Sequence, residues 1–302
     1  MAIVRAARSL GHPCRLVDVP AWRRRLGGLA DPLVGKLARG FRPDAFILTR
    51  HASRLDPDHV RDLCDGLPGG VWYFDYAPEL DMQLLELARA VGRLFVTCRA
   101  QLPRYRAAGI PEVYFLPQAV DPMYDSPATR VPSRYRCDLS FVGSGEYSYR
   151  HELLRRLSAV GVLQVRGPGW EGVSDLPVAG GPIWGRRFAR AVAGAEISIG
   201  AHAAAEQQQM DACDSNRIWK VLGCGGFYLG PWQPGSEDFA RNGEHCVWYR
   251  GTDDAAALAE RYLASPAERA AIAGAGREHA LRYHTYAHRL GLLLEGNGYA
   301  PS

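Results

Sequence analysis

The residues from Asp214 to Arg217 open a segment whose chemistry suits an anion. Asp, Ser and Asn side chains can accept hydrogen bonds from the free N–H groups of a first helical turn, so Asp214, Ser215 and Asn216 predict a helix start. Residues 218–226 continue with apolar side chains at helical spacing and end in three glycines. Such a start attracts anions, and Arg217 adds a positive charge. An ordinary capped helix is the alternative.

A second candidate site lies where an apolar strand at 137–142 meets a glycine turn. Gly143 and Ser144 begin this turn, and residues 149–159 then predict a helix. A turn of this kind lets main-chain N–H groups approach a phosphate closely. Arg150 either adds charge at the turn or is a solvated helix residue. Because Gly-Lys-Ser/Thr does not follow, the turn is not a Walker P-loop.

Three polar residues in the first half of the chain follow predicted strands. Arg50 and His51 come after the apolar strand 44–49, and Asp75 ends the strand 70–76. Ligands of parallel sheets gather beyond the carboxyl ends of the strands, so these residues are candidates for catalysis. His51 suits a general base, and a loop histidine in a structural hydrogen bond is the alternative. Asp75 either orients a substrate hydroxyl or caps the next helix.

Strands and helices alternate along the whole chain, which predicts an α/β fold with parallel sheets covered on both faces. We expect an N-terminal domain at 1–120, a linker at 121–136, a C-terminal domain at 137–285 and a segment at 286–302 that crosses back. The linker is predicted from Pro122, Pro127 and Pro132. The expected strands lie at 44–49, 70–76, 93–97, 113–117, 137–142, 162–167, 195–200 and 227–229, with another ending at 249.

The chain opens in the middle of a Rossmann-like pattern. Residues 2–10 predict a helix and Cys14 to Val19 a strand, which correspond to the helix and second strand of a βαβ unit. No first strand with a glycine-rich loop precedes them. We therefore expect an N-terminal domain without its first strand, either because translation starts further upstream or because the strand has been lost.

Composition excludes several classes of protein. The chain has 302 residues, of which 47% are hydrophobic and 23% charged, as in globular proteins. The net charge of +4 is mild and spread along the chain, so we expect no nucleic-acid partner. Seven scattered cysteines without a C-x-x-C pair are typical of a reducing compartment. With no apolar run near the roughly 20 residues of a membrane span and no secretory signal pattern, we expect a cytoplasmic protein without integral membrane contact.

A metal site is not expected. His284 and His288 stand four residues apart, which is a possible pair of ligands on one helix face. They lack a third ligand and an intervening Glu, so we expect them on a surface helix.

Several ordered motifs resemble those of GT-B-fold glycosyltransferases, specifically the CgeB-like (spore maturation protein-like) branch. In the second half, the motifs are the segments 215–226, 239–244 and 283–289, together with 137–144 followed by Arg150. In the first half, the segments 72–75 and 105–122 are similar to the N-terminal domain of that branch. Each motif is loose by itself, and the resemblance rests on their order along nearly the whole chain.

The resemblance implies two Rossmann-like domains that face a cleft, in the GT-B arrangement. It implies a nucleotide-sugar donor as substrate, bound to the C-terminal domain by the Gly143-Ser144 turn, Arg150, the segment Ser215–Arg217, Lys220 and Glu244. It also implies an acceptor on the N-terminal domain, near Arg50, His51 and Asp75. Main-chain N–H groups and basic side chains would stabilise the leaving diphosphate, so neither a metal nor another cofactor is expected.

One residue departs from the family pattern. Related glycosyltransferases commonly carry a Glu where this chain has Lys220, and that carboxylate usually holds the nucleotide ribose. An ammonium only donates hydrogen bonds, so Lys220 cannot replace it there. Lys220 therefore reaches a phosphate, points to solvent, or marks an altered site.

We expect a metal-independent glycosyltransferase that moves a sugar to a small-molecule, glycan or protein acceptor, with retention of configuration. Inversion would require a base such as His51. A non-catalytic binding or assembly protein with a degenerate fold and an epimerase of nucleotide sugars are the alternatives. The sequence leaves the oligomeric state open.

Overall fold

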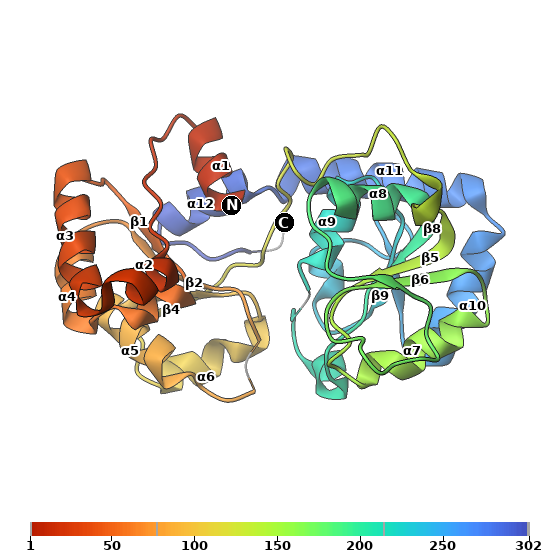
Figure 1. The fold of residues 1–302 in the computed structure, drawn as a ribbon, viewed down its shortest axis with the longest axis horizontal. Coiled ribbons are helices and arrows are strands. Elements are labelled where there is room, and N and C mark those ends of the chain that lie inside the picture. Colours follow the sequence, from red (N-terminus) through yellow and green to blue (C-terminus); the bar gives the residue numbers. More distant parts are fainter. Residues whose placement is uncertain (1, 77, 214, 301–302) are drawn as a thin grey trace. The chain divides into compact units, whose positions relative to one another are not determined.

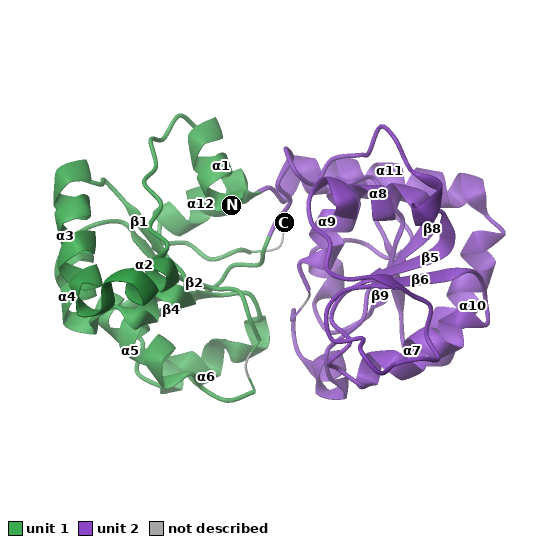
Figure 2. Cartoon of the chain, in the orientation of Figure 1, with its two compact units in different colours: residues 1–118, 286–300 green, residues 119–285, 301–302 purple. Residues whose placement is uncertain are grey.

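The chain folds into two compact α/β units. The structure, a computed structural model, describes residues 2–76, 78–213 and 215–300. The first unit comprises residues 1–118 and 286–300, and the second comprises residues 119–285 and 301–302 (Figure 2). Asp214, named above as a helix-capping residue, lies outside the described residues.

The first unit is built on a parallel sheet of four strands in the order β1-β2-β3-β4 (Figure 1). Its strands are β1 (Phe46–Leu48), β2 (Gly69–Tyr73), β3 (Arg93–Val96) and β4 (Glu112–Phe115). Its helices are α1 (Ala2–Ser9), α2 (Val19–Leu26), α3 (Ala30–Phe41), α4 (Pro57–Cys64), α5 (Met82–Val91), α6 (Leu102–Ala107) and α12 (Tyr286–Leu294).

Helices cover both faces of this sheet, as the continuous apolar strands predict. Every residue of β2 is buried. Consecutive strand residues point to opposite faces. On one face Trp72 meets the ring of Tyr286 in α12, and on the other Tyr73 meets Tyr105 of α6. The Trp72 indole N–H also donates to the carbonyl of Leu116.

The predicted strand from Cys14 to Val19 is wrong. Residues 12–18 form no strand in the structure, and α2 begins at Val19. The reason is local: an Asp18 carboxylate oxygen accepts a hydrogen bond from the N–H of Ala21, and Pro20 stands in the first turn. An acidic cap followed by proline favours a helix start over a strand.

The second unit holds a six-stranded parallel sheet in the order β10-β9-β8-β5-β6-β7. Its strands are β5 (Cys137–Val142), β6 (Leu163–Arg166), β7 (Val178–Gly180), β8 (Ala195–Ile199), β9 (Tyr228–Pro231) and β10 (Val247–Tyr249). Its helices are α7 (Tyr149–Ser158), α8 (Arg186–Gly194), α9 (Arg217–Gly223), α10 (Thr252–Leu263) and α11 (Pro266–Tyr283).

The winding of the second sheet reverses at β5. The chain runs outward from β5 to β6 and β7, and then returns to place β8 on the other side of β5. In sheets of this kind, ligands bind beyond the carboxyl ends of the strands at the point of reversal. The loops that follow β5 and β8 are therefore the first place to look for a site.

The segment 121–136, which we predicted from its prolines as a linker, belongs to the second unit, which begins at Ala119. Asp121, Asp125 and Tyr135 are all buried within it. A carboxylate oxygen of Asp125 accepts a hydrogen bond from the N–H of Asp121, 2.9 Å away. The segment is thus held in shape by a hydrogen bond of its own and is packed as part of the second unit, not as an exposed linker.

The C-terminal segment belongs to the first unit. Arg289 of α12 is 1% exposed, and its Nε donates to the carbonyl of Pro117 at 3.1 Å. Among the helices formed by the described residues, none combines the length and the apolar character that crossing a membrane requires.

Candidate functional site

The turn after β5 needs glycine at position 143. The N–H of Gly143 donates to the carbonyl of Arg166, and the N–H of Gly145 donates to the carbonyl of Pro168. A Cβ atom added at Gly143 would lie 2.6 Å from Nη2 of Arg217. The missing side chain is therefore what allows the Arg217 guanidinium to lie directly against this turn.

Arg217 connects the end of β5 with the loop after β8 through hydrogen bonds of its side chain. Its Nε donates to the carbonyl of Val142 at 2.9 Å and its Nη1 to that of Ala201 at 3.5 Å. The guanidinium lies over the ring of Phe141, 4.8 Å from the ring centre. Only 8% of the residue is exposed. Arg217 thus begins α9 and points into the site instead of into solvent.

Arg150 makes a second bridge between the same two loops. Its Nε donates to the carbonyl of His202 at 2.9 Å, and its Nη1 donates to the carbonyl of Ser144 at 2.8 Å. It is as buried as Arg217, and its guanidinium lies 4.6 Å from the ring centre of Tyr147. The structure therefore brings together four residues singled out in the sequence, namely Gly143, Ser144, Arg150 and Arg217.

These two arginines concentrate positive charge in a buried place. The pKa of Arg150 is lowered to about 10, first by burial and then by the charge of Arg217. Burial also lowers the pKa of Arg217. Among the ion pairs of the described residues, neither arginine has a carboxylate partner. Both donate to neutral main-chain carbonyls, and Arg217 also bonds the side chain of Tyr228, so a bound anion would offset the charge.

His202 lies close enough to the two arginines to feel their charge, and it was not named as a site residue from the sequence. Burial lowers its pKa to about 4, and the charges of Arg150 and Arg217 contribute in the same direction. Its Nε2 is buried without a hydrogen-bond partner in the structure. His202 is therefore neutral near pH 7. Its position just after the strand predicted at 195–200 was the available signal, since strand ends collect functional residues.

The predicted cap of α9 is only partly present. Asn216 stands at the N-cap position, and its side chain makes no capping hydrogen bond. The hydroxyl of Ser215 accepts a hydrogen bond from the N–H of Arg217 at 3.4 Å. Ser215 is exposed and Asn216 is half-buried, whereas most of the helix is buried. α9 is thus a short core helix with its polar start near the surface.

Lys220 lies within reach of both a carboxylate and the arginines. Burial lowers its pKa, the nearby charge of Asp125 raises it, and the charge of Arg217 lowers it. Its ammonium nitrogen is 6.0 Å from the ring centre of Phe188. Lys220 is half-buried, so of the three alternatives the one that points it into open solvent does not hold, and its role in donor binding stays a prediction.

Glu244 lies in the loop before β10, where its carboxylate has its own partners. It pairs with Arg241 at 3.4 Å and with Nε2 of His245 at 3.2 Å. No contact among the described residues joins it to the two buried arginines. Its role in donor binding stays a prediction.

The first unit carries the other predicted residues at the ends of β1 and β2. Nη1 of Arg50 pairs with a carboxylate oxygen of Asp75 at 2.9 Å, and both side chains are about half exposed. His51 follows in the short 3-10 helix Arg50–Arg54 and is exposed. Asp75 does not cap the next helix, because Asp81 is the residue that caps α5. A catalytic role for His51 or Asp75 stays a prediction.

The prediction of a surface helix holds for only one residue of the histidine pair: His288 in α12 is exposed, whereas His284 lies between α11 and α12 and is buried. His284 is 2% exposed, stacks on the ring of Trp219 at 4.4 Å, and places its Nε2 3.0 Å from Nε2 of His279. Aromatic packing explains its burial. Within residues 2–76, 78–213 and 215–300, no group of three or more His, Cys, Asp or Glu residues is placed to hold a metal ion.

Comparison with known proteins agrees with this architecture. Residues 150–295, just under half of the chain, match the glycosyl transferase-like family. Among solved structures, Anabaena Alr3699/HepE in complex with UDP and glucose is similar with a TM-score of 0.63 at 13% identity, over 89% of this chain and 82% of that one. The chain has the GT-B glycosyltransferase fold.

Two further structures support this assignment. A glycosyltransferase from Rickettsia africae has a TM-score of 0.62 at 10% identity, over 97% of this chain and 92% of its own. Sucrose-phosphate synthase from Thermosynechococcus elongatus has a TM-score of 0.57 at 14% identity, over 90% and 79% of the two chains. Among curated proteins, none matches the sequence. The predicted fold class is thereby confirmed, and the family match supports the predicted glycosyltransferase class.

Proposed function

We propose that the protein is a glycosyltransferase that binds a nucleotide sugar on its second unit, with the donor diphosphate at the Gly143-Ser144 turn. The observation that carries this proposal is the pair of buried guanidiniums, Arg150 and Arg217, beneath that turn. Both are held by neutral carbonyls and have no carboxylate partner among the described ion pairs. A diphosphate supplies the negative charge that this place lacks.

The arrangement suits the charge that develops during transfer. When the bond between the sugar and the nucleotide breaks, negative charge builds up on the leaving diphosphate. The two guanidiniums are fixed in advance by their bonds to the loops after β5 and β8, so they stabilise that charge without first having to reorganise. Lys220 adds a third positive group near Arg217.

A uridine diphosphate sugar is the first donor to test. Structures of Anabaena Alr3699/HepE were obtained with UDP and glucose and with UDP-glucose, and that protein shares the fold of this chain. The order of motifs along the sequence supports the CgeB-like branch as part of the same proposal.

Three finer points also belong to the proposal. Retention of the sugar's configuration follows from the family resemblance, and the anomer of the product, identified by NMR, tests it. Metal independence is supported by the positive charge of Arg150 and Arg217, and activity that persists in EDTA tests it. A cytoplasmic location is the third point, and cell fractionation tests it.

The binding experiment compares UDP, GDP and dTDP by thermal shift and calorimetry. One nucleotide should raise the melting temperature, because a ligand that binds only the folded state stabilises it. Arg150→Met should then weaken nucleotide binding at least tenfold, consistent with a loss of about 1.5–3 kcal/mol for a charged hydrogen bond.

The matched control is Arg156→Met. Arg156 lies on the same helix as Arg150 and pairs with Asp253 on the surface. Its substitution by Met removes the same positive charge. Circular dichroism checks that both variants fold, and Arg150→Lys provides a milder substitution. If no nucleotide shifts the melting temperature, or if the folded Arg150→Met protein binds as tightly as the Arg156→Met protein, the proposal is wrong.

A second function, nucleotide-sugar binding without transfer, is favoured by Lys220 alone. The family commonly has a ribose-binding Glu at this position, and an ammonium cannot accept the ribose hydroxyl hydrogen bonds. Release of UDP from UDP-glucose separates the two functions. Tight binding of UDP-glucose with no release of UDP in the presence of candidate acceptors would favour the binding protein.

A further inference from the structure

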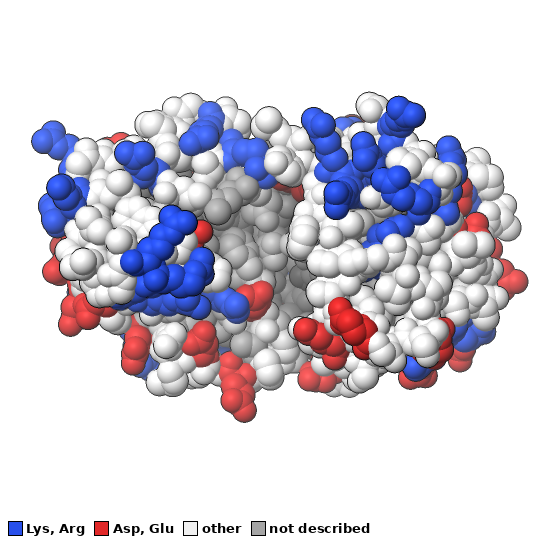
Figure 3. Space-filling view, viewed as in Figure 1, with Lys and Arg blue, Asp and Glu red and all other residues white. Residues whose placement is uncertain are grey.

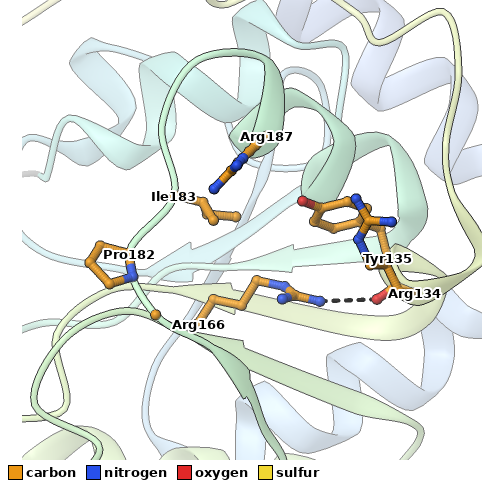
Figure 4. A pocket seen from close by; sticks show the side chains of 7 residues that line it. Arg134, Tyr135, Arg166, Pro182, Ile183 and Arg187 are labelled. Atoms are coloured by element: carbon orange, nitrogen blue, oxygen red, sulfur yellow. Dashed lines mark hydrogen bonds between the residues drawn. The ribbon is translucent and has the colours of Figure 1, made fainter.

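The second unit has a cavity lined by arginines that no function above uses. It has a volume of about 450 Å³ and is lined by Arg134, Tyr135, Arg166, Arg187 and the loop 181–183 (Figure 4). These residues come from the segment before β5, the end of β6, the loop after β7 and the start of α8. Volumes of this size are typical of small-molecule pockets.

The lining of the cavity is strongly positive. Three guanidiniums contribute to it, and no Asp or Glu belongs to the lining. On the face drawn in Figure 3, Lys and Arg side chains gather over the second unit around α8, which carries Arg186, Arg187 and Arg190. Such a concentration of one sign of charge favours an anionic ligand.

Arg166 provides the second observation, because its side chain is buried and incompletely paired. It is 7% exposed. Its Nη1 donates to the carbonyl of Ala179 at 2.7 Å, and its Nη2 donates to the carbonyl of Arg134 and to the amide oxygen of Gln164. Its Nε is buried without a hydrogen-bond partner in the structure. A buried donor left without an acceptor is costly.

The remaining walls suit a small polar molecule. In Figure 4, Arg187 points from α8 towards the side of the cavity where Arg166 lies, with Ile183 beside it. Helix α8 begins after Gly185, which has no side chain to cap it, and its first turn contains no acidic residue. The N–H of Arg187 already donates to the carbonyl of Trp184, so the positive end of the helix dipole is what this helix start adds to the attraction for an anion.

We propose that this cavity binds the phosphate group of a small phosphorylated molecule. A phosphate monoester carries about −1.5 to −2 charges at pH 7 and offers three strong acceptor oxygens. Guanidiniums match this geometry with paired hydrogen bonds. Arg187 and Arg134 hold the phosphate from the exposed side and Arg166 lies beneath it, while Ile183 and the backbone of the loop 181–183 contact the rest of the molecule.

The two arginines assigned to the donor diphosphate are not part of the cavity lining. Arg150 and Arg217 donate to carbonyls in the loops after β5 and β8, and neither lines the cavity. Arg166 contacts the Gly143 turn through its main chain and the cavity through its side chain. Its carbonyl accepts a hydrogen bond from the N–H of Gly143, and its side chain lines the cavity.

The test uses the full chain, with inorganic phosphate and a hexose 6-phosphate as probes at constant ionic strength. Calorimetry measures their binding to the wild type, to Arg187→Gln and to the matched control Arg186→Gln. Both arginines are exposed residues of the first turn of α8, but only Arg187 lines the cavity. We expect saturable binding that Arg187→Gln weakens at least tenfold and Arg186→Gln leaves within twofold.

The two probes identify the source of the phosphate. Tighter binding of the hexose 6-phosphate assigns the site to a phosphomonoester, and equal binding assigns it to free phosphate. UDP affinity is measured in the same variants and should not change in Arg187→Gln.

Three results would overturn the inference. The first is phosphate binding that both variants lose equally or that neither variant loses. The second is a loss of UDP affinity in Arg187→Gln, which would make the cavity part of the donor site. The third is binding to anionic phospholipid vesicles with no binding of either soluble phosphate.

Discussion

The neutral His202 beside two buried arginines makes a quantitative prediction about stability in acid. Its pKa falls from an ordinary value of 6.5 to about 4 in the folded protein, through burial and then the charges of Arg150 and Arg217. In the unfolded chain the imidazole takes up a proton at the higher pH. The unfolded state therefore binds more protons below pH 6.5, and protonation favours unfolding.

The sign and size follow from this difference. The contribution of His202 to the free energy of unfolding is fully present above about pH 6.5 and is lost as the pH falls towards 4. A shift of roughly 2.5 units corresponds to a loss on the order of 3 kcal/mol. His202→Gln removes the titrating group and keeps the main-chain carbonyl that Arg150 needs.

Urea unfolding of the wild type and of His202→Gln between pH 4 and 8 measures the effect. The wild type should lose stability relative to the variant as the pH is lowered, and most of the change should fall between pH 6.5 and 4. The other histidines are present in both proteins and cancel in the difference. A stability difference that stays constant over this range would refute the reasoning, as would an NMR titration of His202 with a midpoint near 6.5.

Three further predictions concern the same site. Saturating UDP should raise the pKa of His202, measured by NMR, because the diphosphate offsets the charge of the arginines; an unchanged midpoint would place the diphosphate elsewhere. Gly143→Ala should lower the free energy of unfolding by about 1–3 kcal/mol and weaken UDP binding, because the new methyl would lie 2.6 Å from Arg217. Gly274→Ala, in an open position of α11, is its control and should not destabilise the protein. Lys220→Met should weaken UDP binding several-fold, measured by calorimetry, and should change the midpoint of urea unfolding only slightly. If the variant and the wild type bind UDP equally well, Lys220 is not part of the donor site.

Much of the fold follows from patterns that the sequence shows directly. Strands β2 and β5 are runs of apolar residues bounded by turn residues, and such runs identify buried parallel strands. The short edge strand β7 was missed because two of its three residues are exposed, so it has no apolar pattern. Helices α2 and α3 were missed because prolines and glycines, which are typical of turns, lie within and between them.

The site was predictable in part. Arg150 and Arg217 were identified because each stands at the start of a helix near a glycine-rich segment. That they share one buried place depends on the pairing of β5 with β8, which local patterns do not encode. The roles of His202 and Arg166 depend on buried side-chain nitrogen atoms that lack a hydrogen-bond partner among the described residues. Only the three-dimensional structure shows this.

The bridges that Arg150 and Arg217 make between the loops after β5 and β8 have a kinetic consequence. Loops are more mobile than the strands they follow, and a ligand that binds a mobile loop has to order it. Here two buried side chains already hold four carbonyls, three in these loops and that of Val142 at the end of β5. Nucleotide association with the second unit should therefore proceed in a single fast phase, without a slower step in which the floor of the site becomes ordered.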